Sequence, residues 1–131
     1  MSSQNTIYDA AALLESGDAA VTASARCDQT EIDLGSASAQ LPATACVEVD
    51  VTAVDFTTAD ETYELKVQLT DVSGFGGTVI DVNQRDITAV GKYIIPVTNE
   101  VNGTRYEFVS LYATLGGTTP SITYTASLSV R

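Results

Sequence analysis

The chain has 131 residues, of which 44% are apolar and 18% charged, which is the size and composition of one folded domain. Its formal net charge is −11, from 17 acidic and 6 basic residues, so it lacks the clustered Lys and Arg that direct nucleic-acid binding needs. It has no histidine, which excludes Ser-His-Asp and Cys-His nucleophiles and imidazole zinc sites, and no apolar run of the ~20 residues that a membrane helix needs.

The N-terminal segment, residues 1–17, is predicted to be an arm in front of a single domain at 18–131. It lacks the basic patch and apolar core of a secretory signal, so we expect the protein to be made in a cytoplasm. Residues 9–16 can form a two-turn helix or an extended segment, and either form is marginal without a surface to dock on. The arm is therefore expected to contact an adjacent subunit through its apolar residues, which are Ile7, Tyr8, Leu13 and Leu14.

Strands are predicted along the rest of the chain, most clearly where apolar residues recur at every second position. The clearest strands cover 46–52, 63–70 and 122–130. Shorter runs rich in β-branched residues predict further strands at 20–24, 30–34, 78–82 and 92–98. Pro96 lacks an N–H group, which favours an edge position or a bulge for the last of these.

The run 105–115 is less regular, because its apolar phase changes in the middle. Tyr106 and Phe108 belong to one phase, whereas Val109 and Leu111 belong to the other. This change predicts a β-bulge, although a strand that is covered on both faces would give the same pattern.

Turn residues separate the predicted strands. Asn102-Gly103 is typical of a type I′ hairpin, and the glycine-rich segments 73–77 and 116–120 predict loops. About eight short strands joined in this way indicate an antiparallel sandwich or barrel.

The acidic residues gather in the first half of the chain. Residues 1–65 contain twelve acidic residues and one basic residue, whereas 66–131 contain five of each. This half is expected to form a solubilising surface or to face cations or a partner of opposite charge. Two sets of acidic residues could offer oxygen ligands to a metal ion. Neither set has the spacing of a calcium-binding loop, so we expect solvated loops without a metal. They are Asp55, Asp60 and Glu61 in one group, and Asp81 and Asp86 in the other.

Few residues remain that could carry chemistry. Cys27 and Cys46 cannot form a closed zinc site, and we expect reduced thiols unless an oxidising medium joins them. Paired carboxylates on the strands are expected to be wet faces, so no enzymatic activity and no cofactor are predicted. Tyr112 lies in the opposite phase to Leu111 and is a candidate for facing a partner, since tyrosine combines apolar area with a polar tip.

Several segments follow one another in a distinctive order. An acidic, valine-rich strand precedes TYELKVQLTDVSGF, and KYIIPVTNEVNGTRYEFVSLYATLGGT and SITYTASLSV come after it. This order resembles the jelly-roll head decoration, or capsid cement, proteins of tailed bacteriophages, from about residue 7 to the end of the chain. The most specific parts are 65–71 and 93–115, whereas the loop at 74–78 is shorter than in many relatives.

The resemblance implies an all-β, antiparallel sandwich of jelly-roll type that assembles as a homotrimer on the outside of a phage head. Such a protein binds the major capsid protein, bridges its subunits and stabilises the shell against the pressure of packaged DNA. It would be located on the outer surface of the virion. One alternative is a carbohydrate-binding or adhesive β-sandwich, which predicts exposed tyrosines, and another is a cupin-type enzyme, which needs histidine metal ligands.

Overall fold

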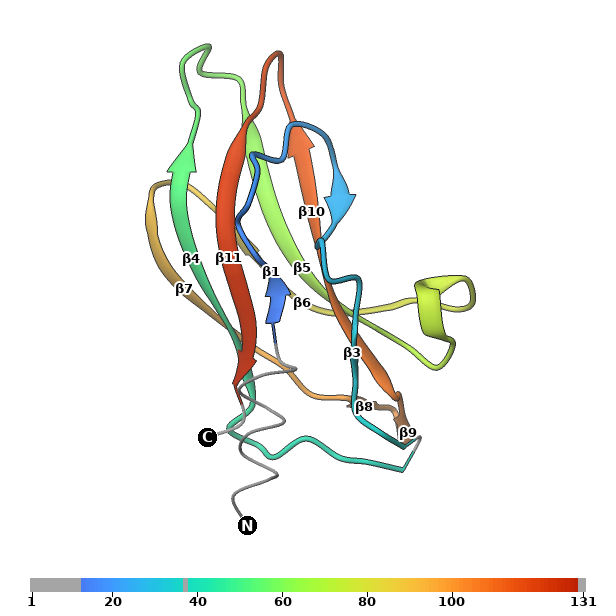
Figure 1. The fold of residues 1–131 in the computed structure, drawn as a ribbon. Coiled ribbons are helices and arrows are strands. Elements are labelled where there is room, and N and C mark those ends of the chain that lie inside the picture. The colour runs from blue at the N-terminus through green and yellow to red at the C-terminus, as the bar shows by residue number, and fades with distance from the viewer. Residues whose placement is uncertain (1–12, 37, 130–131) are drawn as a thin grey trace.

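The structure is a computed structural model that describes residues 13–36 and 38–129. These residues form eleven strands and one short 3-10 turn, and most of the strands lie in two stacked sheets (Figure 1). The predicted all-β sandwich is confirmed. The count exceeds the expected eight because four strands of two or three residues were not predicted, whereas the strand predicted at 20–24 is absent. The four are β1 (Leu13–Glu15), β2 (Ala25–Arg26), β8 (Glu100–Val101) and β9 (Thr104–Arg105).

Neighbouring strands within each sheet pair antiparallel, and apart from β5 and β6 they are not consecutive in the chain. Sheet A has the order β1, β11 (Ile122–Ser129), β4 (Cys46–Val54) and β7 (Gly91–Pro96). Sheet B has the order β2 (Ala25–Arg26), β10 (Phe108–Gly116), β5 (Thr62–Thr70) and β6 (Ile80–Asp86), and β3 (Ile32–Asp33) also pairs with β10. The turn η1 (Ser73–Phe75) lies in the loop between β5 and β6.

The connections identify the topology. Every connection between the strands of sheets A and B crosses from one sheet to the other, except β2 to β3 and β5 to β6. With β2 and β3 counted as one interrupted strand, this gives eight strands in two four-stranded sheets, which is the strand order of a jelly roll. The jelly-roll fold expected from the resemblance is therefore observed.

The hydrophobic core lies between the two sheets because the long strands alternate their side chains. The alternation predicted for 46–52, 63–70 and 122–130 is confirmed within the described residues. Each fully buried valine or leucine contributes about 1.5–3 kcal/mol relative to leaving it exposed. The side chains with no more than 1% exposure include Val47, Val51, Leu65, Val67, Leu69, Val109, Leu111, Ile122 and Tyr124.

The predicted bulge in 105–115 is wrong, and the second interpretation of that run is correct. Strand β10 pairs with β5 without a register shift from Phe108 to Gly116. The irregularity lies in the chain on the other side of β10, which is formed by β2 and β3. Between these two strands the chain has the extra residues 27–31, whereas β10 has only Ser110 and Leu111 over the same distance. This bulged segment covers Ser110, whose hydroxyl donates to the carbonyl of Thr30, so β10 is buried on both faces there.

Side chains of β6 form hydrogen bonds to backbone carbonyl groups on the edge strand β7. Its position at the edge of sheet A agrees with the expectation from Pro96. The carbonyl of Pro96 accepts a hydrogen bond from the Asn83 amide at 3.0 Å, and the carbonyl of Ile94 accepts one from Arg85 at 3.4 Å. These contacts occupy edge groups that would otherwise be available to pair with another strand.

The hairpin of β8 and β9 turns at Asn102-Gly103 as predicted, with φ of 52° and 81° at the two residues. Both values are positive, which is the requirement of a type I′ turn and the reason for asparagine and glycine at these positions.

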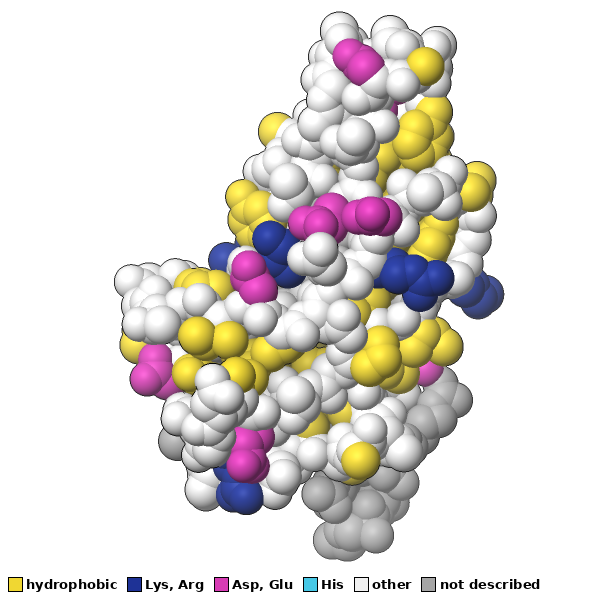
Figure 2. All heavy atoms as spheres, turned by 180° about the vertical axis from the view of Figure 1, so that it is seen from behind, with side chains coloured by type: hydrophobic (Ala, Val, Ile, Leu, Met, Phe, Trp, Pro, Cys, Tyr) yellow, Lys and Arg dark blue, Asp and Glu magenta, His cyan; other side chains and the backbone are white. Residues whose placement is uncertain are grey.

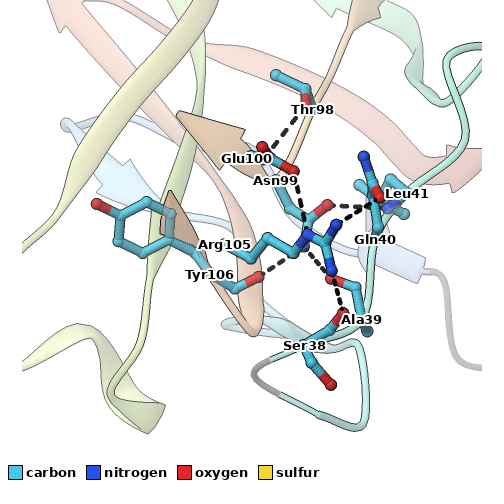
Figure 3. A network of polar contacts seen from close by, with 9 residues as sticks. All are labelled: Ser38, Ala39, Gln40, Leu41, Thr98, Asn99, Glu100, Arg105 and Tyr106. Atoms are coloured by element: carbon cyan, nitrogen blue, oxygen red, sulfur yellow. Dashed lines mark hydrogen bonds and ion pairs between the residues drawn. The ribbon is translucent and has the colours of Figure 1, made fainter. Parts of the chain in front are cut away.

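A buried asparagine fixes this end of the sandwich (Figure 3). Asn99 is fully buried; its amide oxygen accepts from the Leu41 N–H at 2.9 Å, and its amide nitrogen donates to the carbonyls of Ala39 at 2.7 Å and Tyr106 at 2.9 Å. Arg105 adds an ion pair to Glu100 at 3.0 Å and hydrogen bonds to the segment 38–40. The polar groups of Asn99 are thus all satisfied, and they join three separate parts of the chain.

Two expectations for the beginning of the chain are corrected. Residues 20–24 form no strand, only an isolated bridge between Val21 and Ile122. Residues 13–15 are the extended strand β1, paired with β11, so the helix alternative is wrong for them, whereas 9–12 lie outside the described residues. Sheet A therefore begins inside the segment that was predicted as an arm.

Candidate interaction surfaces

The structure separates the residues that were predicted to contact other subunits. Ile7 and Tyr8 lie outside the described residues. Leu13 is 40% exposed on the outer face of sheet A, but Leu14 is fully buried between the sheets. Leu14 packs in the core of its own chain because successive residues of a strand point to opposite faces, and its predicted contact with another subunit stays a prediction. Tyr112 is half-buried on the outer face of sheet B.

The outer face of sheet A carries a shallow depression of about 480 Å³. Successive cross-strand partners place Leu13, Ser127, Glu48 and Ile94 in one row across all four strands. Ile94, at the far end of this row, is 57% exposed. This row thus has exposed apolar side chains at its two ends and polar ones between them.

On the outer face of sheet B, Tyr112 belongs to an aromatic cluster around Arg26. The Arg26 guanidinium carbon lies 4.1 Å from the ring centre of Phe75 and 5.4 Å from that of Tyr112. Glu31, in the bulged segment, accepts hydrogen bonds from the Ser73 hydroxyl at 2.7 Å and the Gly74 N–H at 2.8 Å. These contacts attach the η1 loop to the β2–β3 edge, and Tyr112 is part of that attachment.

Acidic and basic side chains cross the middle of this side of the molecule, with apolar side chains among them (Figure 2). Lys66 forms ion pairs with Glu64 at 3.7 Å and with Asp81 at 3.5 Å. Asp81 also accepts from the Gln68 amide at 2.8 Å. Because these groups compensate one another, the middle of the face is mixed in charge rather than acidic.

A second depression, of about 440 Å³, lies where β5 begins and β6 ends. The ring of Phe56 stands edge-on to that of Tyr63, with centroids 5.3 Å apart and an interplanar angle of 87°. Three carboxylate residues also line the depression, and no Lys or Arg does. The lining residues are Phe56, Glu61, Thr62, Tyr63, Glu64, Asp86, Ile87, Thr88 and Thr114.

Glu61 differs from the other carboxylates because it is only 5% exposed. Its Oε2 atom accepts from the backbone N–H of Thr58 at 3.2 Å and from the Thr58 hydroxyl. Its Oε1 atom is buried and has no hydrogen-bond partner. A buried carboxylate oxygen without a donor is costly, since desolvation is not offset by a hydrogen bond.

The carboxylates of the first group that was considered for a metal ion accept hydrogen bonds from threonines, and Asp60 and Glu61 share the hydroxyl of Thr58. Asp55 accepts from the Thr57 N–H at 2.8 Å, and Asp60 accepts from Thr118, including its hydroxyl at 2.5 Å. These hydrogen bonds lower the pKa of both aspartates. Within the described residues, no group of three or more Asp, Glu or Cys side chains is placed to hold a metal ion.

Glu61 could have been singled out from the sequence by its phase. It stands two residues before Tyr63 and four before Leu65, and therefore continues the buried side of β5. Glu61 was instead grouped with Asp55 and Asp60 as a loop carboxylate, because the alternation was not extended backward across the start of β5.

Glu15 and Asp28 join the β1 edge of sheet A to the bulged segment of sheet B. The Asp28 N–H donates to Glu15 Oε1 at 2.9 Å, and the Ser16 N–H donates to Asp28 Oδ1 at 3.0 Å. Burial, and then the charge of Asp28, raise the pKa of Glu15. Slight desolvation of Asp28 is outweighed by hydrogen bonds from the side chain and backbone of Ser16, which lower the pKa of Asp28.

Cys27 and Cys46 are not joined by a disulfide, and Cys27 is buried whereas Cys46 is half-buried. Burial raises the pKa of the Cys27 thiol, which lies 3.5 Å from the Ser110 hydroxyl. A raised pKa keeps this sulfur in the protonated, unreactive form at neutral pH.

Comparisons with known proteins assign no family. No protein-family description matches the chain, and no curated protein matches its sequence. The only helical element in the described part of the chain is η1, so none there is long and apolar enough to cross a membrane.

Proposed function

We propose that the protein is a capsid decoration, or cement, protein of a tailed bacteriophage. It binds the outer surface of the head as a homotrimer and bridges subunits of the major capsid protein. The observation that supports this proposal is the strand order of sheets A and B, which is the jelly-roll order that the resemblance implies.

The proposed role is passive, and the polar groups of the fold are consistent with it. Asp55 and Asp60 accept hydrogen bonds from threonines, and the side chain of Asn99 is hydrogen-bonded to backbone groups. A protein of this kind acts by binding only the assembled lattice, which stabilises that lattice by mass action. Many copies that each add a modest contact reach a large total effect through multivalency.

The tyrosines favour this proposal over a carbohydrate-binding module. None of the five tyrosines that the structure describes is exposed: Tyr63 and Tyr124 are buried, and Tyr93, Tyr106 and Tyr112 are half-buried. Tyr93 donates to the Ala89 carbonyl at 2.8 Å, and Tyr63 accepts from the Ser121 N–H at 2.9 Å. The described surface thus lacks the cluster of exposed tyrosines that sugar binding was expected to need.

Two experiments test the proposal. Size-exclusion chromatography with light scattering should give three times the mass of one chain, and a strict monomer at micromolar concentration would count against the trimer. Deletion of the coding sequence from the phage should yield heads that burst at lower temperature and under milder osmotic shock. Heads of unchanged resistance would contradict the proposed function.

A further inference from the structure

The depression beside Phe56 contains an incomplete polar site. Three side-chain atoms among the described residues are buried and lack a hydrogen-bond partner, namely Arg26 Nη1, Glu61 Oε1 and Gln68 Oε1. Of the three residues, only Glu61 is itself more than nine-tenths buried, and it lines the depression. Arg26 and Gln68 are half-buried and line neither depression. Native proteins rarely leave such an atom unpaired, so Glu61 is expected to meet a donor that enters from the depression.

The charge around Glu61 selects a cation as the donor. Glu64 and Asp86 lie directly opposite each other on β5 and β6, and both line the same depression. Lys66 pairs with Glu64 but does not line the depression, and Asp86 is exposed with no ion pair inside the described residues. A positive group here would gain attraction from Glu61 and Asp86, and less from Glu64 because Lys66 already compensates its charge.

The aromatic side chains distinguish an organic cation from a metal ion. Glu61, Glu64 and Asp86 are not placed as a set of metal ligands. Phe56 is 38% exposed and stands edge-on to Tyr63 at the same depression. The exposed ring of Phe56 beside these carboxylates suits a lysine or arginine side chain, because the methylene stem packs on the ring while the head binds the oxygens.

We propose that the depression formed by Phe56, Glu61 and Asp86 binds a lysine or arginine side chain that projects from the partner protein. This inference rests on the proposed function for the identity of that partner, the major capsid protein. It gives the partner surface a specific chemistry: an exposed basic residue positioned to insert at the β5–β6 corner of the jelly roll. The charged head would approach the carboxylates of Glu61 and Asp86, and to reach Glu61 Oε1, which is covered in the structure, it must displace the side chains over that atom.

Nuclear magnetic resonance titration of the folded protein with capped single residues tests the site itself. The probes are Nα-acetyl-lysine amide and Nα-acetyl-arginine amide, with Nα-acetyl-norleucine amide as the uncharged control. We expect saturable shifts at Phe56, Glu61 and Thr88 with the basic probes and none with norleucine. Equal shifts with all three probes, or shifts spread evenly over the acidic surface, would overturn the proposal.

Matched variants separate the site from general attraction to an acidic protein. Glu61→Gln and Asp86→Asn should each weaken the basic probes by about tenfold. Asp50→Asn removes the same charge from the depression on the other sheet and should leave their affinity unchanged. If Glu61→Gln fails to fold, Asp86→Asn still decides the question, because Asp86 is exposed.

Co-sedimentation with purified phage heads then connects the site to the partner. If the wild-type protein sediments with heads and Glu61→Gln and Asp86→Asn do not, both proposals hold. If wild type and variants sediment equally, the partner does not use this site, although the proposed function stands. If the wild-type protein stays in the supernatant, the proposed function fails, and the titration result still decides the chemistry of the depression.

Discussion

Asn99 and Glu61 are two buried polar residues at different places in the sandwich, and they differ in whether their side-chain hydrogen-bonding groups are paired. Asn99 is fully buried, and its amide oxygen and nitrogen together make three hydrogen bonds to backbone groups of distant segments. Glu61 is almost as buried, but one of its two oxygens has no donor. The side-chain hydrogen-bonding groups of Asn99 are therefore all paired, whereas Glu61 leaves one acceptor atom open.

This difference gives a physical criterion for separating structural from functional polar residues. A satisfied network adds stability and rigidity, and its loss exposes several unpaired groups at once. An unsatisfied buried group lowers stability, so replacing it should cost little in folding and much in binding. The two residues should therefore respond to mutation in opposite ways.

The largest change in the free energy of unfolding is expected for Asn99→Ala. The change leaves the Leu41 N–H and the carbonyls of Ala39 and Tyr106 without their partner, which should lower the free energy of unfolding by about 4 kcal/mol. Urea denaturation followed by circular dichroism measures it. The neighbouring Thr98→Ala, which loses one exposed hydrogen bond to the Glu100 N–H, is the control and should change little. Equal losses in the two variants would refute the role given to Asn99.

Gly117→Ala tests the backbone on which Glu61 rests. Gly117 has a φ of +99°, and an added Cβ would lie 2.6 Å from the Asp60 carbonyl oxygen and 2.7 Å from the Glu61 Cα. Strain and collision together should lower the free energy of unfolding by about 2–3 kcal/mol. Gly103→Ala is the matched control, because its φ is also positive, at +81°, but nothing lies within 4 Å of the added atom. Thermal unfolding of both variants should rank Gly117→Ala as clearly less stable.

Glu15→Gln tests a third buried polar residue, a carboxyl group that has a donor but a raised pKa. Because the pKa is raised, the charged form of Glu15 opposes folding once the pH exceeds its value in the folded state. The amide keeps the acceptor for the Asp28 N–H and removes the charge, so the variant should be more stable than the wild-type protein at pH 7. This gain should disappear as the pH falls below 4.5, the ordinary pKa of the group. A gain that is independent of pH would show that the charge is not its cause.

The smallest effect on stability is expected for Glu61→Gln. The amide oxygen can still accept from Thr58, and the buried charge is removed, so the free energy of unfolding should change by less than about 1 kcal/mol. Denaturation in parallel with Asn99→Ala gives the direct comparison. A loss as large as that of Asn99→Ala would mean that Glu61 is a structural residue, and the criterion drawn here would fail.

Much of the fold follows from the sequence because its signals are local. The alternation in 46–52 and 63–70 follows from the pleat, and the Asn102-Gly103 turn follows from the positive φ that both residues adopt. Pro96 marks an edge strand for the same kind of reason.

The errors come from contacts between distant segments. The phase change near Phe108 was caused by the segment 27–31 covering β10, which no window around 105–115 contains. Leu14 was taken for an arm residue because three residues are too few to show a strand pattern, and only the pairing with β11 buries it. The depression at Glu61 likewise combines residues from the 55–61 loop, β5, β6 and β10.

Electron cryomicroscopy of the assembled phage particle tests the central claim most directly. The account predicts jelly-roll density in threefold clusters on the outer surface of the head, each copy touching more than one capsid subunit, with a basic side chain of the capsid protein at Glu61 and Asp86. A head surface without this density, or the chain found only in another part of the virion, would contradict it.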